Sequence, residues 1–125
     1  MIHPCVAVVE DNADNRLLLS VLLSDDYRVV EYETGPDALR GLAADPPDVV
    51  VLDISLPGMD GVEVLQRIRE DARLRTLPVI AFTAHAMAGD RERLLGHGFD
   101  EYVTKPIVDE TLLLGAIQRV LARSP

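Results

Sequence analysis

Apolar and polar residues alternate along the chain in blocks that predict strands and helices in turn. Short apolar runs rich in β-branched residues are typical of strands buried on both faces of a sheet. The segments between these runs carry apolar residues at helical spacing, and capping residues, glycine or proline mark their ends. The pattern predicts strands at 5–9, 28–32, 49–53, 77–82 and 101–104. It predicts helices at about 15–24, 35–44, 62–70, from 87 or 90 to 95, and at 109–123.

Local side chains predict where several of these elements begin and end. Asp14 is a suitable N-cap for the first helix, and Thr34 is one for the second. Pro36 follows Thr34 at a first-turn position that needs no N–H donor. The Asp60-Gly61 pair turns the chain after the third strand, and the Gly96-His97-Gly98 cluster ends the fourth helix.

Five alternations of strand and helix with short connections predict an α/β fold with a parallel sheet and helices on both faces. The chain has 125 residues, enough for one domain, and we expect 1–125 to form it. Right-handed crossovers place the carboxyl ends of all parallel strands at one edge of the sheet. Ligands bind at that edge in open α/β sheets.

Charge and composition exclude several kinds of site. The net charge of −9 argues against a general surface that grips nucleic acid or an anionic membrane. The single Cys5, expected as a small core residue, excludes an internal disulfide and a cysteine-based metal cage. The three histidines share no ligand spacing. The sequence shows no signal peptide and no apolar run of about 20 residues, so we expect a cytoplasmic protein.

Charged and polar side chains follow the predicted strands. Glu10 and Asp11 follow the first, Asp53 ends the third, Thr83 follows the fourth and Lys105 the fifth. Three converging carboxylates need a cation, and oxygen ligands at a turn suit Mg²⁺. A carboxylate can attack phosphorus, while a metal, a lysine and a hydroxyl stabilise the phosphoryl oxygens. Taken singly, the acids are also suitable turn or cap residues, and Thr83 and Lys105 suitable surface residues.

The motifs at these positions resemble those of a two-component response-regulator receiver domain. They are Val9-Glu10-Asp11-Asn12 with Asn15-Arg16, Asp53 with Leu56-Pro57-Gly58-Met59-Asp60-Gly61, Thr83-Ala84, and Tyr102-Val103-Thr104-Lys105-Pro106. The resemblance covers nearly the whole chain, in order. It implies a doubly wound five-stranded parallel sheet with the flavodoxin-like strand order 2-1-3-4-5.

The resemblance also implies a role for each site residue. Asp53 is the expected phosphoacceptor, and Lys105 the expected partner of a phosphate oxygen. Asp11, Asp53 and the Ser55 carbonyl are expected to bind Mg²⁺ directly, and Glu10 through water. Thr83 is the expected switch hydroxyl. Tyr102 is expected either to change rotamer with Thr83 or simply to pack, and Pro106 is expected to follow a cis peptide.

Implied partners are a histidine kinase or histidine phosphotransfer protein and a downstream protein, with the chain a monomer or weak dimer. No enzymatic activity is expected beyond autophosphorylation and autodephosphorylation. Leu17 and Val21 on the first helix either complete the core or dock a phosphotransfer helix. His85 either borders the site or is simply exposed.

Other functions are compatible with parts of the pattern. A haloacid-dehalogenase-type phosphatase also has a nucleophilic Asp after a strand, but Ser55 stands where that family needs a second Asp. An interaction module that needs no phosphate is a further alternative. A flavodoxin is disfavoured because no Ser/Thr-rich phosphate loop follows the first strand. The sequence leaves open a stand-alone regulator or a domain of a hybrid kinase.

Overall fold

The structure is a computed structural model that describes residues 3–84, 89–105, 107 and 109–123. Strands and helices alternate along the chain as the sequence pattern predicts. The strands are β1 (Cys5–Val9), β2 (Arg28–Tyr32), β3 (Val49–Asp53), β4 (Val79–Thr83) and β5 (Glu101–Thr104). The helices are α1 (Ala13–Leu23), α2 (Gly35–Ala44), α3 (Gly61–Glu70), α4 (Asp90–His97) and α5 (Glu110–Arg123).

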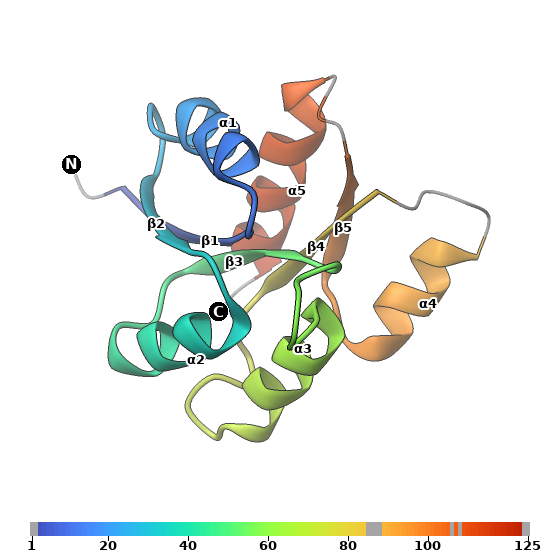
Figure 1. Ribbon diagram of the computed structural model, residues 1–125. Helices are drawn as coiled ribbons and strands as arrows, with labels where there is room; N and C mark the ends of the chain where they lie inside the picture. The colour runs from blue at the N-terminus through green and yellow to red at the C-terminus, as the bar shows by residue number, and fades with distance from the viewer. Residues whose placement is uncertain (1–2, 85–88, 106, 108, 124–125) are drawn as a thin grey trace.

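The strands form one parallel sheet in the order β2-β1-β3-β4-β5, which confirms the expected topology. Helices α1 and α5 cover one face, and α2, α3 and α4 lie on the other (Figure 1). Strand β1 pairs with β2 on one side and with β3 on the other, so the direction in which strands are added reverses between β1 and β3. The carboxyl ends of β1 and β3 therefore border the crevice where this fold class binds ligands.

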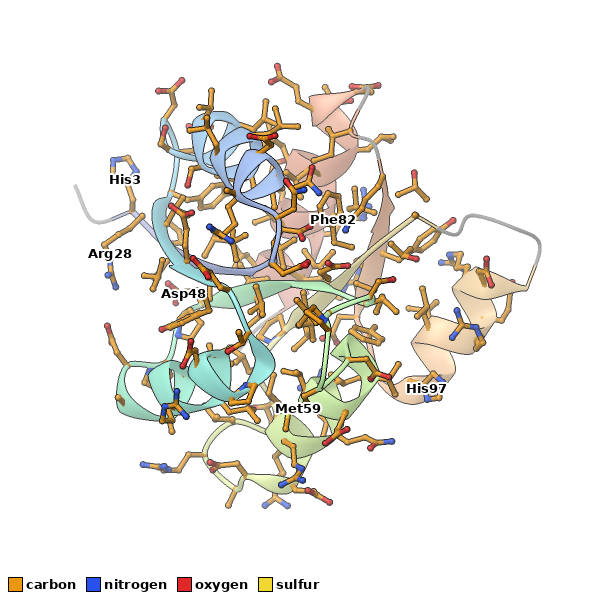
Figure 2. The ribbon with its side chains drawn as sticks, viewed as in Figure 1. His3, Arg28, Asp48, Met59, Phe82 and His97 are labelled. Carbon is orange, nitrogen blue, oxygen red and sulfur yellow. The ribbon has the colours of Figure 1, made fainter. Side chains whose placement is uncertain are left out.

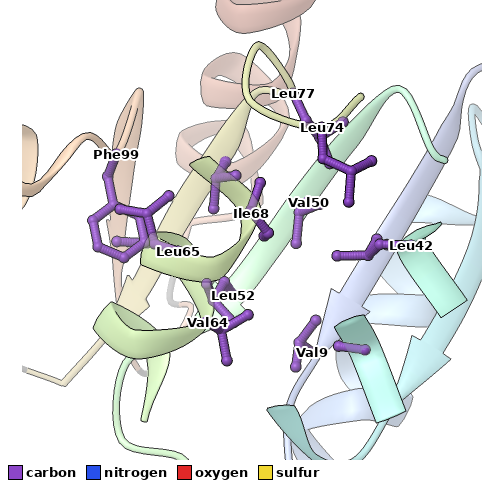
Figure 3. Close-up of a cluster of buried hydrophobic side chains, with 14 of the residues drawn as sticks. Val9, Leu42, Val50, Leu52, Val64, Leu65, Ile68, Leu74, Leu77 and Phe99 are labelled. Carbon is purple, nitrogen blue, oxygen red and sulfur yellow. The ribbon is translucent and has the colours of Figure 1, made fainter. Parts of the chain in front are cut away.

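Two apolar clusters, one on each face, hold the layers together. On the α2, α3 and α4 face, side chains of the central strands pack against Leu42, Val64, Leu65, Ile68 and Phe99 (Figure 3). On the α1 and α5 face, the cluster combines Leu19, Leu23, Leu113 and Ile117 with the other side of the same strands. Because β1, β3 and β4 are buried along their full lengths, their ends are fixed in position relative to one another.

The structure corrects the predicted N-cap of the first helix. Helix α1 begins at Ala13 and is capped by Asn12, whose extended backbone lets its side chain accept a hydrogen bond from Asn15 N. Asp14 lies inside the first turn, where a carboxylate is favoured by the helix dipole. The predicted caps Thr34 and Asp60 do accept bonds from Asp37 N and Glu63 N, respectively.

The remaining differences shift boundaries by a few residues. Strand β4 begins at Val79, because Leu77 N closes a turn on Leu74 O. Helix α4 continues to His97 and ends on Gly98, which has φ 112°. Helix α5 begins at Glu110. Met87, the alternative start of the fourth helix, lies outside the described residues.

Arg69 ties three segments together at the edge of the sheet where β4 and β5 begin. Its Nη1 donates to the carbonyls of Arg75 (3.1 Å) and Leu77 (2.6 Å). Its Nη2 donates to Gly98 O (2.9 Å) and to Asp100 Oδ2 (3.1 Å). The same Asp100 oxygen accepts Val79 N. The end of α3, the start of β4 and the turn after α4 are therefore held by one guanidinium.

Candidate functional site

Side chains from three strand ends meet at the carboxyl edge of the sheet. Glu10 directly follows β1, Asp53 ends β3, and Lys105 directly follows β5. Lys105 Nζ lies 3.0 Å from Glu10 Oε1 and 3.0 Å from Asp53 Oδ1. Carboxylate oxygens of Glu10, Asp11 and Asp53 lie within 4.8 Å of one another. The structure thus brings together the four charged residues that the sequence pattern predicts.

Asp53 lies in the turn that connects β3 to α3. Its side chain is 2% exposed, and Oδ1 accepts a hydrogen bond of 3.0 Å from the backbone N–H of Ser55. Gly61, the first residue of α3, approaches the same turn closely: a Cβ atom added to it would lie 2.4 Å from Asp53 O. The turn and the start of α3 therefore hold the phosphoacceptor candidate in one position.

Glu10 is 1% exposed, but both of its carboxylate oxygens have donors. Asn12 N donates to Oε2 (3.1 Å) and Asn15 Nδ2 to Oε1 (3.3 Å). Burial raises the pKa of the Glu10 carboxyl, and the nearby charge of Asp53 adds to this effect. The Asn12 amide and Lys105 act in the opposite direction, because both stabilise the charged form.

Lys105 is the cation of this cluster. Burial alone lowers the pKa of its ammonium, but its bonds to Glu10 and Asp53 more than compensate, so the pKa lies above the ordinary value. Its Nζ also lies 4.9 Å from the centroid of the Phe82 ring, a favourable cation–π distance. Phe82, labelled in Figure 2, belongs to the apolar cluster under α1 and α5. Lys105 therefore remains charged at neutral pH.

Two further predicted residues lie on β4 and on β5, the strand that leads to Lys105. Thr83, 1% exposed, ends β4, and its carbonyl accepts a 2.7 Å hydrogen bond from Lys105 N. Tyr102 lies on β5, half-buried against the α2, α3 and α4 face. It also lines a groove of about 460 Å³ with Arg91, Leu112 and Arg119. Pro106 and His85 lie outside the described residues.

Some residues that hold the site were missed as contributors, although the sequence places them near the acids. Asn15 holds the Glu10 carboxylate, Arg16 bonds to the backbone of Glu10 and Asp11, and Phe82 supports Lys105. The available signal was spacing: Asn15 and Arg16 lie one helical turn past the acids. His3 and His97 lie on opposite sides of the molecule, so these two side chains cannot bind one metal ion together (Figure 2).

The donor set fits a divalent cation. Glu10, Asp11 and Asp53 offer hard oxygen ligands, of which Asp11 is exposed and the other two buried. When all are ionised, Lys105 balances one of the three charges, and one divalent cation balances the rest. Such a cation that binds few carboxylates and keeps water ligands is typically Mg²⁺.

A comparison with family models decides the family. The model of the response regulator receiver domain matches residues 6–118, a range that includes every site residue described above. The chain belongs to the response regulator receiver domain family. Such receiver domains belong to two-component and phosphorelay systems.

Two curated relatives of this receiver domain differ greatly in length. The sensor histidine kinase GacS of Pseudomonas protegens is 42% identical over 113 residues, which cover 87% of this chain and 12% of the kinase. The response regulator DivK of Brucella ovis is 39% identical over 103 residues, which cover 82% of this chain and 84% of DivK. The chain thus spans about an eighth of the kinase and most of the small regulator.

A solved structure has the same fold. The receiver domain of sensor histidine kinase PA1611 from Pseudomonas aeruginosa is 32% identical, with a TM-score of 0.86. The match covers 96% of this chain and 98% of that one. The PA1611 crystal structure has a magnesium ion coordinated in its active-site cleft.

Proposed function

We propose that this receiver domain, residues 1–125, accepts a phosphoryl group on Asp53 from a histidine kinase or histidine phosphotransfer protein. The observation that carries the proposal is the convergence of Glu10, Asp11, Asp53 and Lys105 at the edge of the sheet. Family membership adds to this support. The two buried acids Glu10 and Asp53 are costly to bury, and a phosphorylation site accounts for them, for the exposed Asp11 and for Lys105.

In the proposed reaction, Asp53 Oδ2 attacks the phosphorus of a phosphohistidine. A new O–P bond forms, the P–N bond breaks, and the imidazole nitrogen keeps the electron pair. The product is an acyl phosphate on Asp53. Ser55 N and Lys105 both contact Oδ1, so they orient the carboxylate with Oδ2 as the attacking atom. Autophosphorylation and autodephosphorylation are the remaining chemistry that we assign to the domain.

Lys105 and Thr83 stabilise the phosphoryl oxygens in this proposal. Lys105 already lies 3.0 Å from Asp53 Oδ1, within reach of a group attached to the carboxylate. Thr83 ends the neighbouring strand, paired in register with Thr104. We assign the switch to Thr83 and Tyr102. Tyr102 lines the groove on β5 and α5, and Thr83 is paired in register with Thr104, which lines the same groove.

The metal site is assigned to Asp11, Asp53 and the Ser55 carbonyl, with Glu10 as a ligand through water. A bound Mg²⁺ would neutralise charge on the phosphoryl oxygens during transfer. The coordinated magnesium ion of the PA1611 receiver domain supports this assignment.

The proposed partners are a phosphohistidine donor and a downstream protein, and we place the domain in the cytoplasm as a monomer or weak dimer. Leu17, Leu18 and Val21 of α1 are 64, 42 and 61% exposed, an apolar face suited to a helix of the donor. No helix in the described part of the chain is long and apolar enough to cross a membrane.

The test is phosphorylation by acetyl phosphate with Mg²⁺, followed by mass spectrometry of the intact protein. We expect the wild type to gain one phosphoryl group and Asp53→Asn to gain none. The control is Asp60→Asn, which changes an exposed aspartate but keeps an oxygen that can cap α3. Equal labelling of Asp53→Asn and the wild type would remove Asp53 as the acceptor. Mg²⁺-dependent turnover of a phosphomonoester would favour a phosphatase instead.

A further inference from the structure

Arg16 contacts the backbone that carries two of the proposed metal-binding acids. It lies in α1, and its side chain is 14% exposed. Its Nη1 donates to Glu10 O (2.9 Å) and to Asp11 O (3.1 Å). One guanidinium nitrogen thus bonds to the backbone carbonyls of both acids and leaves their carboxylates directed to the site.

The other nitrogens of Arg16 are anchored to acids at the end of β2. Nη2 lies 3.2 Å from Glu33 Oε1, and Nε lies 3.5 Å from Glu31 Oε1. Glu31 is held in turn by the hydroxyl of Ser20, which donates to Oε2 (3.0 Å). The guanidinium therefore links α1, the end of β2 and the loop after β1.

This linkage stabilises the loop after β1, which carries groups that repel one another. Carboxylate oxygens of Glu10, Asp11 and Asp53 lie within 4.8 Å of one another, and Lys105 balances only one of the three charges. Without a metal ion, the remaining repulsion therefore favours a loop that opens. A planar guanidinium can hold adjacent carbonyls and carboxylates in one fixed arrangement. A lysine at this position has a single nitrogen for the same partners.

We propose that Arg16 is a positioning residue that holds Glu10 and Asp11 in the geometry needed to bind a divalent cation. This rests on the proposed function, since it concerns the same metal site. Arg16 has two opposite effects on cation binding. Its positive charge repels the cation, whereas its hydrogen bonds hold the cation's ligands in place. Removing it therefore weakens Mg²⁺ binding only if positioning outweighs repulsion.

The experiment is a calorimetric titration of unphosphorylated protein with Mg²⁺ for the wild type, Arg16→Lys and Arg16→Met. We expect both variants to bind about 10-fold more weakly, as is usual when a residue that supports metal ligands is lost. Arg16→Lys keeps the charge, so its loss of affinity reports geometry. Arg67→Met, which removes an exposed arginine paired with Glu63 on α3, is the matched control and should bind like the wild type.

A second measurement separates positioning from general loss of stability. In metal-free protein, hydrogen exchange of the Asn12 amide, which donates to Glu10, should quicken in Arg16→Lys but not in Arg67→Met. Glu33→Gln, which loses only one anchor of Arg16, should weaken Mg²⁺ binding by a smaller factor. These variants are compared well below their melting temperatures.

The outcomes are distinguishable. Unchanged Mg²⁺ affinity in Arg16→Lys, with unchanged or tighter binding in Arg16→Met, would overturn the role of Arg16 and leave the proposed function standing. A wild type that binds no Mg²⁺ but is still phosphorylated on Asp53 would overturn the metal site and this inference with it. A wild type that is not phosphorylated would contradict the proposed function itself.

Discussion

The absence of a side chain at Gly61 lets the start of α3 lie close to the backbone of Asp53. A Cβ atom at this position would lie 2.4 Å from Asp53 O and 2.7 Å from Ile54 Cα, and its N–H donates to Ile54 O (3.0 Å). Backbone atoms cannot move aside as the end of a flexible side chain can. A methyl group here would therefore displace either the start of α3 or the turn that carries the phosphoacceptor.

We expect Gly61→Ala to lower the free energy of unfolding by about 1–3 kcal/mol, the usual effect of forcing a group into a packed site. It should also slow phosphorylation of Asp53 by acetyl phosphate. Urea denaturation and the rate of phosphorylation measure the two effects.

Gly96→Ala is the control for this substitution, because a Cβ atom on Gly96 of α4 would meet nothing within 4 Å among the described neighbours. It should raise stability by about 0.5–1 kcal/mol, as expected for alanine in a helix. A Gly61→Ala variant as stable and as reactive as the wild type would show that the turn after β3 is not constrained as described.

At the residue scale, the sequence predicted the chemical groups of the site but not their supports. Glu10, Asp53, Thr83 and Lys105 were found because each stands at the end of a predicted strand, and parallel strands end at one edge of the sheet. The structure confirms that these groups lie at one edge of the sheet. Asn15 and Arg16 belong to the motif after the first strand, but their bonds to Glu10 and Asp11 become visible only in the structure. The roles of the four strand-end residues, and those assigned to Asp11, Ser55, Tyr102 and Pro106, stay predictions.

At the scale of the element, α1 has two apolar sides. Leu19 and Leu23 pack into the core under α1 and α5, whereas Leu17 and Val21 face outward. A groove of about 420 Å³ runs beside the outward side, lined by Leu18, Leu22, Ile107 and the first residues of α5. Sequence periodicity indicated an apolar surplus at Leu17 and Val21, and the structure shows that both side chains are exposed rather than packed in the core.

We expect Leu17→Gln combined with Val21→Gln to slow phosphotransfer from a histidine phosphotransfer domain about 10-fold, a factor equivalent to about 1.4 kcal/mol. Phosphorylation by acetyl phosphate, which needs no docking surface, should stay unchanged. Leu112→Gln on α5, 56% exposed in the wild type, is the control with an equivalent change on another face. Equal losses with both donors would mean that the substitutions damage the site rather than a docking surface.

At the scale of the whole molecule, the alternation of strands and helices was enough to predict an α/β fold with two covered faces. The alternation does not predict the order of the strands, because five short strands can pair in several ways. The resemblance to a known family supplied the order. The predicted start of the first helix was wrong because two nearby residues, Asn12 and Asp14, are both suitable N-caps. The extended backbone at Asn12 makes Asn12 the cap.

The excess of negative charge at the sheet edge also affects the stability of the whole domain. A cation that binds the folded state alone stabilises it, by about 2.7 kcal/mol at about 100 times its dissociation constant. We expect Mg²⁺ to raise the melting temperature by several degrees relative to EDTA, measured by circular dichroism. Asp11→Asn should lose most of this shift. Identical melting in Mg²⁺ and EDTA would contradict the metal site.

The guanidinium of Arg69 has a consequence for how α4 responds to events at the other edge of the sheet. The last turn of α4 is fastened: Gly98 O bonds to Arg69, Phe99 is buried, and Asp100 is tied to β4. The first turn instead follows Gly89, which supplies no side-chain cap. We therefore expect a structural change at Thr83 to displace the N-terminal end of α4 more than its C-terminal end.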